Sequence, residues 1–191
     1  MPTVNNLKNI LKVSSIILIL FQVSCVQYKK RESIIVASAG KIDSLDPAQA
    51  NTLRTLQILS ALGDTLYKIN KEGNLSPNLA KDLPKTSKDG LLIDIPLKEN
   101  IYFHDGSSFN AKAMEFSLNR FMRIGTLNYL LNEKIEDILV KDEFLLRIKL
   151  KKPSSSLKSL LTSVNLTPIS PNSYSNYKDS FYNKNFIGTG P

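Results

Sequence analysis

Apolar residues along the chain follow two spacings, an alternation typical of strands and a spacing of three to four residues typical of helices. The alternation is clearest in residues 144–150, which carry apolar side chains at every second position: Phe144, Leu146, Ile148 and Leu150. A second apolar segment, 134–140, precedes it and is separated from it by the polar residues 141–143. Two such segments joined by a short polar turn are typical of neighbouring antiparallel strands. The pattern therefore predicts a β-hairpin.

Shorter apolar runs predict three more strands. Residues 33–39 form a β-branched run that is typical of a buried strand, and residues 66–70 form a second run. Residues 91–97 alternate, and Pro96 within them predicts an edge position or a bulge because proline donates no backbone hydrogen bond. Between these runs, residues 75–83 contain a proline and a small apolar cluster. This composition favours an irregular segment packed on the core.

Three segments are expected to be helices. The first follows Asn51, which we expect to cap it, and its apolar stripe consists of Leu56, Leu59, Leu62 and Leu66. The second follows Asn110, a residue type favoured at helix N-caps, and Phe109 and Met114 occupy the positions of a hydrophobic staple. A third, short helix is expected at residues 155–162, with the serines of 154–156 as its cap. The predicted fold class is therefore α/β in the broad sense, a mixed α+β protein.

The composition excludes several kinds of chemistry. One cysteine forms neither an intramolecular disulfide nor a cysteine zinc or iron–sulfur site, and one histidine leaves no His-rich metal site. A single histidine also leaves little material for a Ser-His-Asp hydrolase. The 25 basic and 17 acidic side chains give a formal net charge of +8, but the basic residues are dispersed and lack interleaved aromatics. We therefore expect no metal, no cofactor and no nucleic-acid partner.

The remaining candidates for catalysis have simpler structural explanations. His104 stands beside an Asp-Gly turn signal, in which Asp105 is expected to bond its own turn. The acidic pairs 136–137 and 142–143 fall in or beside the predicted hairpin, where charges usually face solvent. The Gly-Thr-Gly sequence at 188–190 lacks the lysine and the helix that follow a phosphate loop. We therefore expect no catalytic residue; the enzyme alternative is a secreted hydrolase that depends on His104.

Residues 1–24 have the pattern of an export signal. Lys8 and Lys12 supply positive charge without an acidic residue, and the mostly apolar stretch 13–23 follows them. A membrane-spanning helix needs about 20 apolar residues, whereas the core of a signal peptide needs roughly 7–15 behind a positive start. We therefore expect residues 1–24 to be a signal peptide rather than a membrane anchor.

The single cysteine, Cys25, follows this apolar stretch directly. Together with Val23 and Ser24 it resembles a bacterial lipobox, in which the cysteine is lipidated and becomes the mature N-terminus. Gln22 departs from the aliphatic residue that is usual at its position. The resemblance implies a lipidated tether at residues 25–32, whose basic residues lie near lipid headgroups. The alternative is a free cysteine that is buried by chance.

Several short motifs follow one another after the predicted signal peptide. Residues 44–47 read Ser-Leu-Asp-Pro, residues 73–80 read Gly-Asn-Leu-Ser-Pro-Asn-Leu-Ala, and residues 102–111 read Tyr-Phe-His-Asp-Gly-Ser-Ser-Phe-Asn-Ala. Ser-Leu-Asn-Arg at 117–120 and Gly-Thr-Gly-Pro at 188–191 come after them. In this order the motifs resemble the N-terminal part of a bacterial family 5 extracellular solute-binding protein. This family comprises oligopeptide-, dipeptide- and nickel-binding receptors of ABC importers.

The resemblance implies a fold and a function. Residues 33–191 would be the N-terminal portion of a two-lobed periplasmic-binding-protein-like fold with mixed sheets, incomplete because the second lobe is missing. The function would be that of the substrate-binding component of an ABC importer. Such a component captures a peptide or similar small solute in the periplasm and delivers it to permease subunits without covalent chemistry. As a lipoprotein it would be anchored to the cell membrane.

The resemblance also implies a binding segment. In the family, the residues after the Leu-Asp-Pro motif border the ligand cleft, and their backbone groups pair with an extended ligand like an added strand. Here that segment comprises Ala50, Asn51, Thr52 and Leu53. The alternative for Asn51 is that it only caps the helix. For the whole chain, the alternative is a small surface lipoprotein that retains part of the receptor fold as a structural or interaction module.

Overall fold

The computed structural model describes residues 39–182 and 184–190. The predicted signal peptide 1–24, the tether 25–32 with Cys25, and residues 33–38 of the first predicted strand lie outside the described residues. Within the described ranges, no helix is both long and apolar enough to cross a membrane. The helices and strands named below all belong to the unit Gly40–Pro191.

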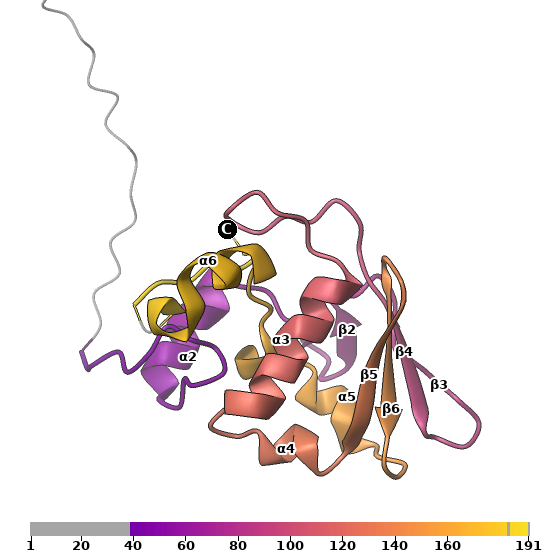
Figure 1. The fold of residues 1–191 in the computed structure, drawn as a ribbon. Helices are drawn as coiled ribbons and strands as arrows, with labels where there is room; N and C mark the ends of the chain where they lie inside the picture. The colour runs from indigo at the N-terminus through magenta and orange to yellow at the C-terminus, as the bar shows by residue number, and fades with distance from the viewer. Residues whose placement is uncertain (1–38, 183, 191) are drawn as a thin grey trace, which may run out of the picture. The chain divides into compact units, whose positions relative to one another are not determined.

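The main sheet has four antiparallel strands in the order β3, β4, β6, β5 (Figure 1). They comprise Lys85–Thr86 (β3), Leu92–Pro96 (β4), Ile135–Asp142 (β5) and Leu145–Leu150 (β6). β5 and β6 follow each other directly along the chain and pair with each other, which confirms the predicted hairpin. The pairing buries the alternating apolar residues of both strands on one face of the sheet.

The two faces of this sheet differ in polarity. Helix α3 (Ala111–Ile124) lies across the inner face (Figure 1). This face consists of buried aliphatic side chains: Ile93, Ile95, Leu146, Ile148 and Leu150. On the outer face, Arg147 pairs with Asp94 (Nε–Oδ1, 2.6 Å) and Lys149 pairs with Glu136 (Nζ–Oε1, 2.8 Å). Glu136 therefore forms an ion pair with a basic neighbour at the surface, as expected for a charge on the hairpin.

Pro96 marks neither an edge strand nor a bulge, so this prediction is wrong. β4 lies between β3 and β6, and Pro96 is its last residue, paired with Leu145. On the other side, β3 pairs with β4 only at Ile93 and Asp94. Because β3 ends before it reaches Pro96, the missing N–H of the proline interrupts no ladder there.

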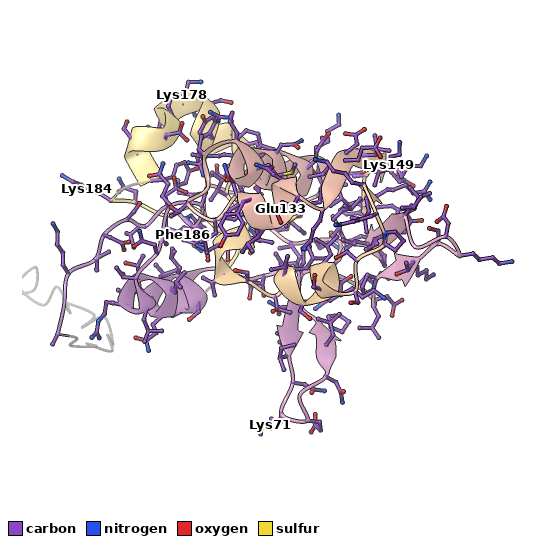
Figure 2. The ribbon with its side chains drawn as sticks, turned by 90° about the horizontal axis from the view of Figure 1, so that it is seen from below. Lys71, Glu133, Lys149, Lys178, Lys184 and Phe186 are labelled. Carbon is purple, nitrogen blue, oxygen red and sulfur yellow. The ribbon has the colours of Figure 1, made fainter. Side chains whose placement is uncertain are left out.

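A second sheet contains two antiparallel strands, β1 (Tyr67–Ile69) and β2 (Leu75–Pro77). β1 confirms the strand predicted at 66–70. The turn between the strands contains Gly73 with a φ of 80°, a backbone conformation that favours glycine. Lys71 lies at the tip of this hairpin, away from the other elements (Figure 2).

The strand β2 corrects the expectation of an irregular segment at 75–83. Residues 75–77 of this segment pair with β1, and Pro77 lies opposite Tyr67 at the end of the ladder. A proline is tolerated here because both strands of a two-stranded sheet are edge strands, so one side of each is free of partners. The strand was missed because Pro77 lowers the strand signal of a short run.

Helix α2 (Leu53–Leu62) begins after Thr52 rather than Asn51. The Thr52 hydroxyl accepts a hydrogen bond from the Thr55 N–H (3.3 Å), which is the contact that defines an N-cap. The expectation that Asn51 caps this helix is therefore wrong by one residue. Leu66, expected in the helical stripe, lies beyond the C-terminal end of the helix and is buried immediately before β1.

The predicted start of α3 is confirmed in detail. The Asn110 side-chain oxygen accepts a hydrogen bond from the Ala113 N–H (3.1 Å), which satisfies a donor in the first turn. Phe109 and Met114 are both fully buried on either side of this cap, as a hydrophobic staple requires. The local sequence therefore determines where this helix begins.

The remaining elements are shorter or were not predicted. They comprise α4 (Tyr129–Asn132), α5 (Ser156–Leu160), the 3₁₀ helix η1 (Val164–Leu166) and α6 (Pro171–Tyr182). α5 confirms the short helix expected at 155–162, although the side chain of Ser155 at its N-cap position makes no capping hydrogen bond. α4, η1 and α6 are additional. Helices packed on antiparallel sheets confirm the mixed α/β class.

Candidate functional site

The predicted binding segment connects an irregular loop to helix α2. Ala50 is fully buried, Asn51 is exposed, Thr52 is half-buried, and Leu53 is 73% exposed. The segment therefore presents the side chains of Asn51 and Leu53 to solvent, while its first residue is fixed in the interior.

Most backbone polar groups at the start of this segment are engaged within the chain. The Ala50 N–H donates to the Asp46 carbonyl (2.9 Å), and the Ala50 carbonyl accepts from the Asn165 side-chain amide (2.8 Å). The Asn51 N–H donates to a carboxylate oxygen of Asp43 (3.2 Å). The side chains of this segment that face solvent and are not used in this bonding are therefore those of Asn51 and Leu53, whereas the Thr52 hydroxyl bonds to Asp43 and Thr55.

Asp43 holds the start of α2 in place. Its carboxylate accepts hydrogen bonds from the hydroxyls of Thr55 and Thr52 as well as from the Asn51 N–H. Burial raises the pKa of Asp43, but these hydrogen bonds lower it by more, so that the pKa lies well below its usual range. A permanent negative charge at the N-terminus of α2 is favourable because the helix dipole is positive there.

A buried ion-pair network lies just before the segment. The Arg120 guanidinium forms a bidentate pair with Asp46, with distances of 2.8 Å from Nη1 to Oδ1 and 2.5 Å from Nη2 to Oδ2. It also donates to Asp179 through Nε (3.0 Å) and Nη2 (2.6 Å). Asp46 and Arg120 are almost completely buried, whereas Asp179 is partly exposed.

The environment of Arg120 keeps the guanidinium charged. Burial lowers its pKa, but Asp46 and Asp179 raise it by more, so that the pKa lies above its usual range. The rings of Tyr174 and Tyr182 lie within 5.4 Å and 5.6 Å of the guanidinium carbon. Arg120 thus joins α3, α6 and the turn that precedes the binding segment.

Asp105 confirms the expected turn and adds a contact that was not predicted. Within the turn, its carboxylate accepts from the Ser107 N–H (3.0 Å) and the Ser107 hydroxyl (2.5 Å). It also accepts from the hydroxyls of Ser170 and Ser173, each at 2.5 Å. Burial raises the pKa of Asp105, and these hydrogen bonds lower it by more, to well below its usual range. Asp105 therefore fixes the start of α6 against the turn.

His104 has a structural role in this arrangement. The Gly188 N–H donates to Nδ1 (3.3 Å), which assigns the ring proton to Nε2, and Nε2 then donates to the Gly190 carbonyl (2.7 Å). The Gly190 backbone lies so close to the Leu62 carbonyl that a Cβ would clash with it. Both ring nitrogens of His104 therefore form hydrogen bonds that hold residues 188–190 in place.

The described residues contain no group of three or more His, Cys, Asp and Glu side chains that could hold a metal ion. The other named candidate, Cys25, lies outside the described residues. Residues that sequence reasoning missed are Asp43, Asn165 and Arg120, all of which position the binding segment.

Comparison with known proteins relates the chain to transport receptors. A family model described as bacterial extracellular solute-binding proteins, family 5 Middle, matches residues 74–191. The glutathione-binding protein GsiB of Salmonella typhi is 29% identical over 163 residues, which cover 84% of this chain and 31% of the relative. The chain therefore spans about a third of the length of the curated relatives that it matches.

Solved structures show the same fold. Listeria monocytogenes OppA bound to peptide matches with a TM-score of 0.73 and 22% identity, over 81% of this chain and 34% of that chain. An ABC transporter-associated periplasmic binding protein, DppA from Helicobacter pylori in complex with the peptide STSA, matches with a TM-score of 0.70 and 24% identity. That match covers 80% of this chain and 34% of DppA. These matches give no support to the alternative of a small surface lipoprotein with a structural role.

Proposed function

Because the chain belongs to the bacterial extracellular solute-binding proteins of family 5, we propose that it is part of the substrate-binding component of an ABC importer for peptides or similar small solutes. Members of this family are binding proteins and not enzymes. In the proposed function, the ligand is captured outside the inner membrane by closure of lobes around it and is then delivered to permease subunits.

The observation that carries this proposal is the family match over residues 74–191. The peptide chemistry is supported by the named ligands of the similar proteins, which are glutathione for GsiB and peptides for OppA and DppA. All of these ligands are short chains of amino acids, with amide groups and charged ends.

The proposed ligand contacts come from Asn51, Thr52 and Leu53. Ala50, which precedes them, is buried and holds the start of the segment in place. The backbone of Ala50 is held by Asp46 and Asn165, so that the segment keeps one conformation before a ligand arrives. A preorganised segment loses little conformational freedom on binding, which favours affinity. Leu53 offers an exposed apolar side chain and Asn51 an amide that both donates and accepts hydrogen bonds.

Uptake of labelled peptides tests this function. Deletion of the gene is expected to abolish uptake of at least one of labelled dialanine, trialanine and glutathione, and the intact gene is expected to restore it. Leu53→Asp is expected to reduce the restored uptake about tenfold, because it places a charge at an apolar contact. Leu83→Asp is the matched control, since Leu83 is exposed elsewhere, and it should restore uptake fully. Unchanged uptake of all three peptides after deletion contradicts the proposal.

We further propose that residues 1–24 direct export and that Cys25 carries lipid, which anchors the tether 25–32 and the receptor at the outer surface of the cell membrane. Cells grown with labelled palmitate are expected to label the parent chain and to leave the Cys25→Ser variant unlabelled. Ser24→Ala keeps a small residue before the cysteine and should retain the label. Equal labelling of the parent and the Cys25→Ser variant would exclude Cys25 as the attachment point. Cys25 is the only cysteine in the sequence, so the label would then be attached to another residue type.

A further inference from the structure

Helix α6 and the residues just after it carry a surface on which aromatic and basic side chains lie together. This α6 surface consists of Tyr174, Tyr177, Lys178, Phe181 and Lys184. The ring of Tyr177 is stacked on that of Phe181, with centroids 4.4 Å apart, yet the Tyr177 side chain remains 53% exposed. Tyr177 thus faces outward, while Phe181 is half-buried and also meets the buried ring of Tyr182 edge to face.

Two lysines flank the aromatic rings. Lys178 has a φ of 61°, and its Nζ lies 5.7 Å from the centroid of the Tyr174 ring. The Lys184 N–H donates to the Phe181 carbonyl (3.3 Å), which keeps Lys184 beside the stacked pair. Figure 2 shows the side chains of both lysines pointing outward from this part of the molecule.

The charge of this surface is positive. In the part of the chain that the structure describes, neither Lys178 nor Lys184 forms an ion pair with a carboxylate. Asp179 is the acidic residue of α6, and its carboxylate is bound to Arg120. Arg123 of α3 adds a further cation, because its Nη2 donates to the Tyr174 hydroxyl (3.2 Å).

Aromatic rings with a polar edge, placed beside lysines, are the side chains that proteins position at the headgroup level of a bilayer. The lysines are attracted to anionic headgroups, and the rings enter the boundary between headgroups and acyl chains. We propose that the α6 surface rests on an anionic lipid membrane.

The length of chain before the described residues is compatible with this contact. Residues 26–39 separate Cys25 from Gly40, and 14 extended residues reach at most about 50 Å. Lipid attached at Cys25, as proposed above, would therefore keep the unit that begins at Gly40 within reach of the bilayer. The contact with anionic lipid does not require that attachment, and it is independent of the ligand.

A second copy of the chain fits this surface less well than a membrane does. A symmetric dimer through the α6 surface would bring Lys178 and Lys184 of one copy against the same residues of the other. Like charges that meet in this way repel each other. An anionic membrane instead compensates these charges.

The absence of tryptophan from the chain allows a direct test. Tyr177→Trp in the full chain places a single fluorophore on the α6 surface, and Tyr129→Trp places one on α4, where Tyr129 is 52% exposed. With vesicles containing about 30% phosphatidylglycerol, indole emission of the Tyr177→Trp variant is expected to shift to the blue and to be quenched by brominated acyl chains. With vesicles of phosphatidylcholine alone, this variant should not respond, and the Tyr129→Trp variant should respond to neither kind of vesicle.

Charge reversal tests the contribution of the lysines. Each lysine near an anionic surface strengthens binding about fivefold. In the Tyr177→Trp background, Lys178→Glu with Lys184→Glu is therefore expected to reduce indole quenching to the level seen with neutral vesicles. Lys68→Glu with Lys71→Glu, on the β1–β2 hairpin, removes the same charge elsewhere and should leave the quenching unchanged. Lys71 lies on the other side of the molecule from α6 in Figure 2.

Three outcomes would overturn the proposal. Equal quenching of the Tyr177→Trp variant by neutral and anionic vesicles would exclude a role for lipid charge. Equal quenching of the Tyr177→Trp and Tyr129→Trp variants would mean that the whole chain approaches the bilayer without a preferred face. A blue shift that grows with protein concentration in the absence of vesicles would assign the surface to a second copy of the chain.

Discussion

Replacing Arg120 with alanine is expected to lower the free energy of unfolding by about 3–5 kcal/mol. The substitution removes the bidentate partner of Asp46 and leaves that fully buried carboxylate without a counterion. It also releases Asp179, and with it one of the contacts between α3 and α6. Urea unfolding followed by circular dichroism measures the change, and the midpoint is expected to fall without loss of cooperativity.

The ion pair of Arg147 with Asp94 provides the matched control. It has the same residue types and similar distances, but both side chains are partly exposed on the outer face of the sheet. Arg147→Ala should therefore lower the free energy of unfolding by only about 1 kcal/mol or less. Equal effects of the two substitutions would mean that burial of the Asp46–Arg120 pair does not decide its importance.

Replacing Phe109 with alanine is expected to lower the free energy of unfolding by about 3–5 kcal/mol. Phe109 is fully buried, meets the ring of Phe103 edge to face with centroids 6.0 Å apart, and forms the staple that fixes the start of α3. The loss combines the apolar contacts of the ring with the cavity that remains. Thermal unfolding and urea unfolding of this variant should both show a lower stability than that of the parent chain.

Tyr102→Ala is the control for a change of similar size at a neighbouring position. Tyr102 is 56% exposed, so its removal opens no cavity, and an effect within about 0.5 kcal/mol is expected. A loss for Phe109→Ala as small as this would show that the N-terminus of α3 repacks around the missing ring.

The parts of the fold that were predictable are those that neighbouring residues determine. The cap at Asn110 and the staple of Phe109 with Met114 use contacts within five positions, and each is present as expected. The β5–β6 hairpin depends on alternation and on a short turn, which are equally local. Such features are visible in sequence because no distant partner is needed to form them.

Features that join distant segments could not be predicted in this way. Arg120 and Asp46 are 74 positions apart, and nothing in either local pattern names the other. The available signal was an arginine beside the apolar face of α3, which indicates a buried charge that needs a partner without identifying it. Helix α6 was missed because its polar and aromatic residues give no apolar stripe; Arg120 and the Asp105 carboxylate hold it in place.

The candidate binding segment shows both situations. Its place at the start of α2 followed from the local pattern, to within the one residue that separates Asn51 from Thr52. Its internal bonding did not, because Asn165 lies 115 positions from Ala50. The hydrogen bond from that distant amide holds the Ala50 carbonyl toward the interior. The sequence of the segment alone does not indicate whether this carbonyl faces the interior or the solvent.

The position of His104 also makes it a spectroscopic reporter. It is the only histidine in the chain, so its ring nitrogens give a single pair of nitrogen-15 resonances that need no assignment by mutation. With Nδ1 accepting from Gly188 and Nε2 donating to Gly190, the two nitrogens are inequivalent and their resonances should differ widely. Release of residues 188–190 would remove both contacts and let the proton exchange between the two nitrogens, which would bring the resonances closer together. The chain thus carries its own probe of local opening, and that probe can be observed without a label in any other residue type.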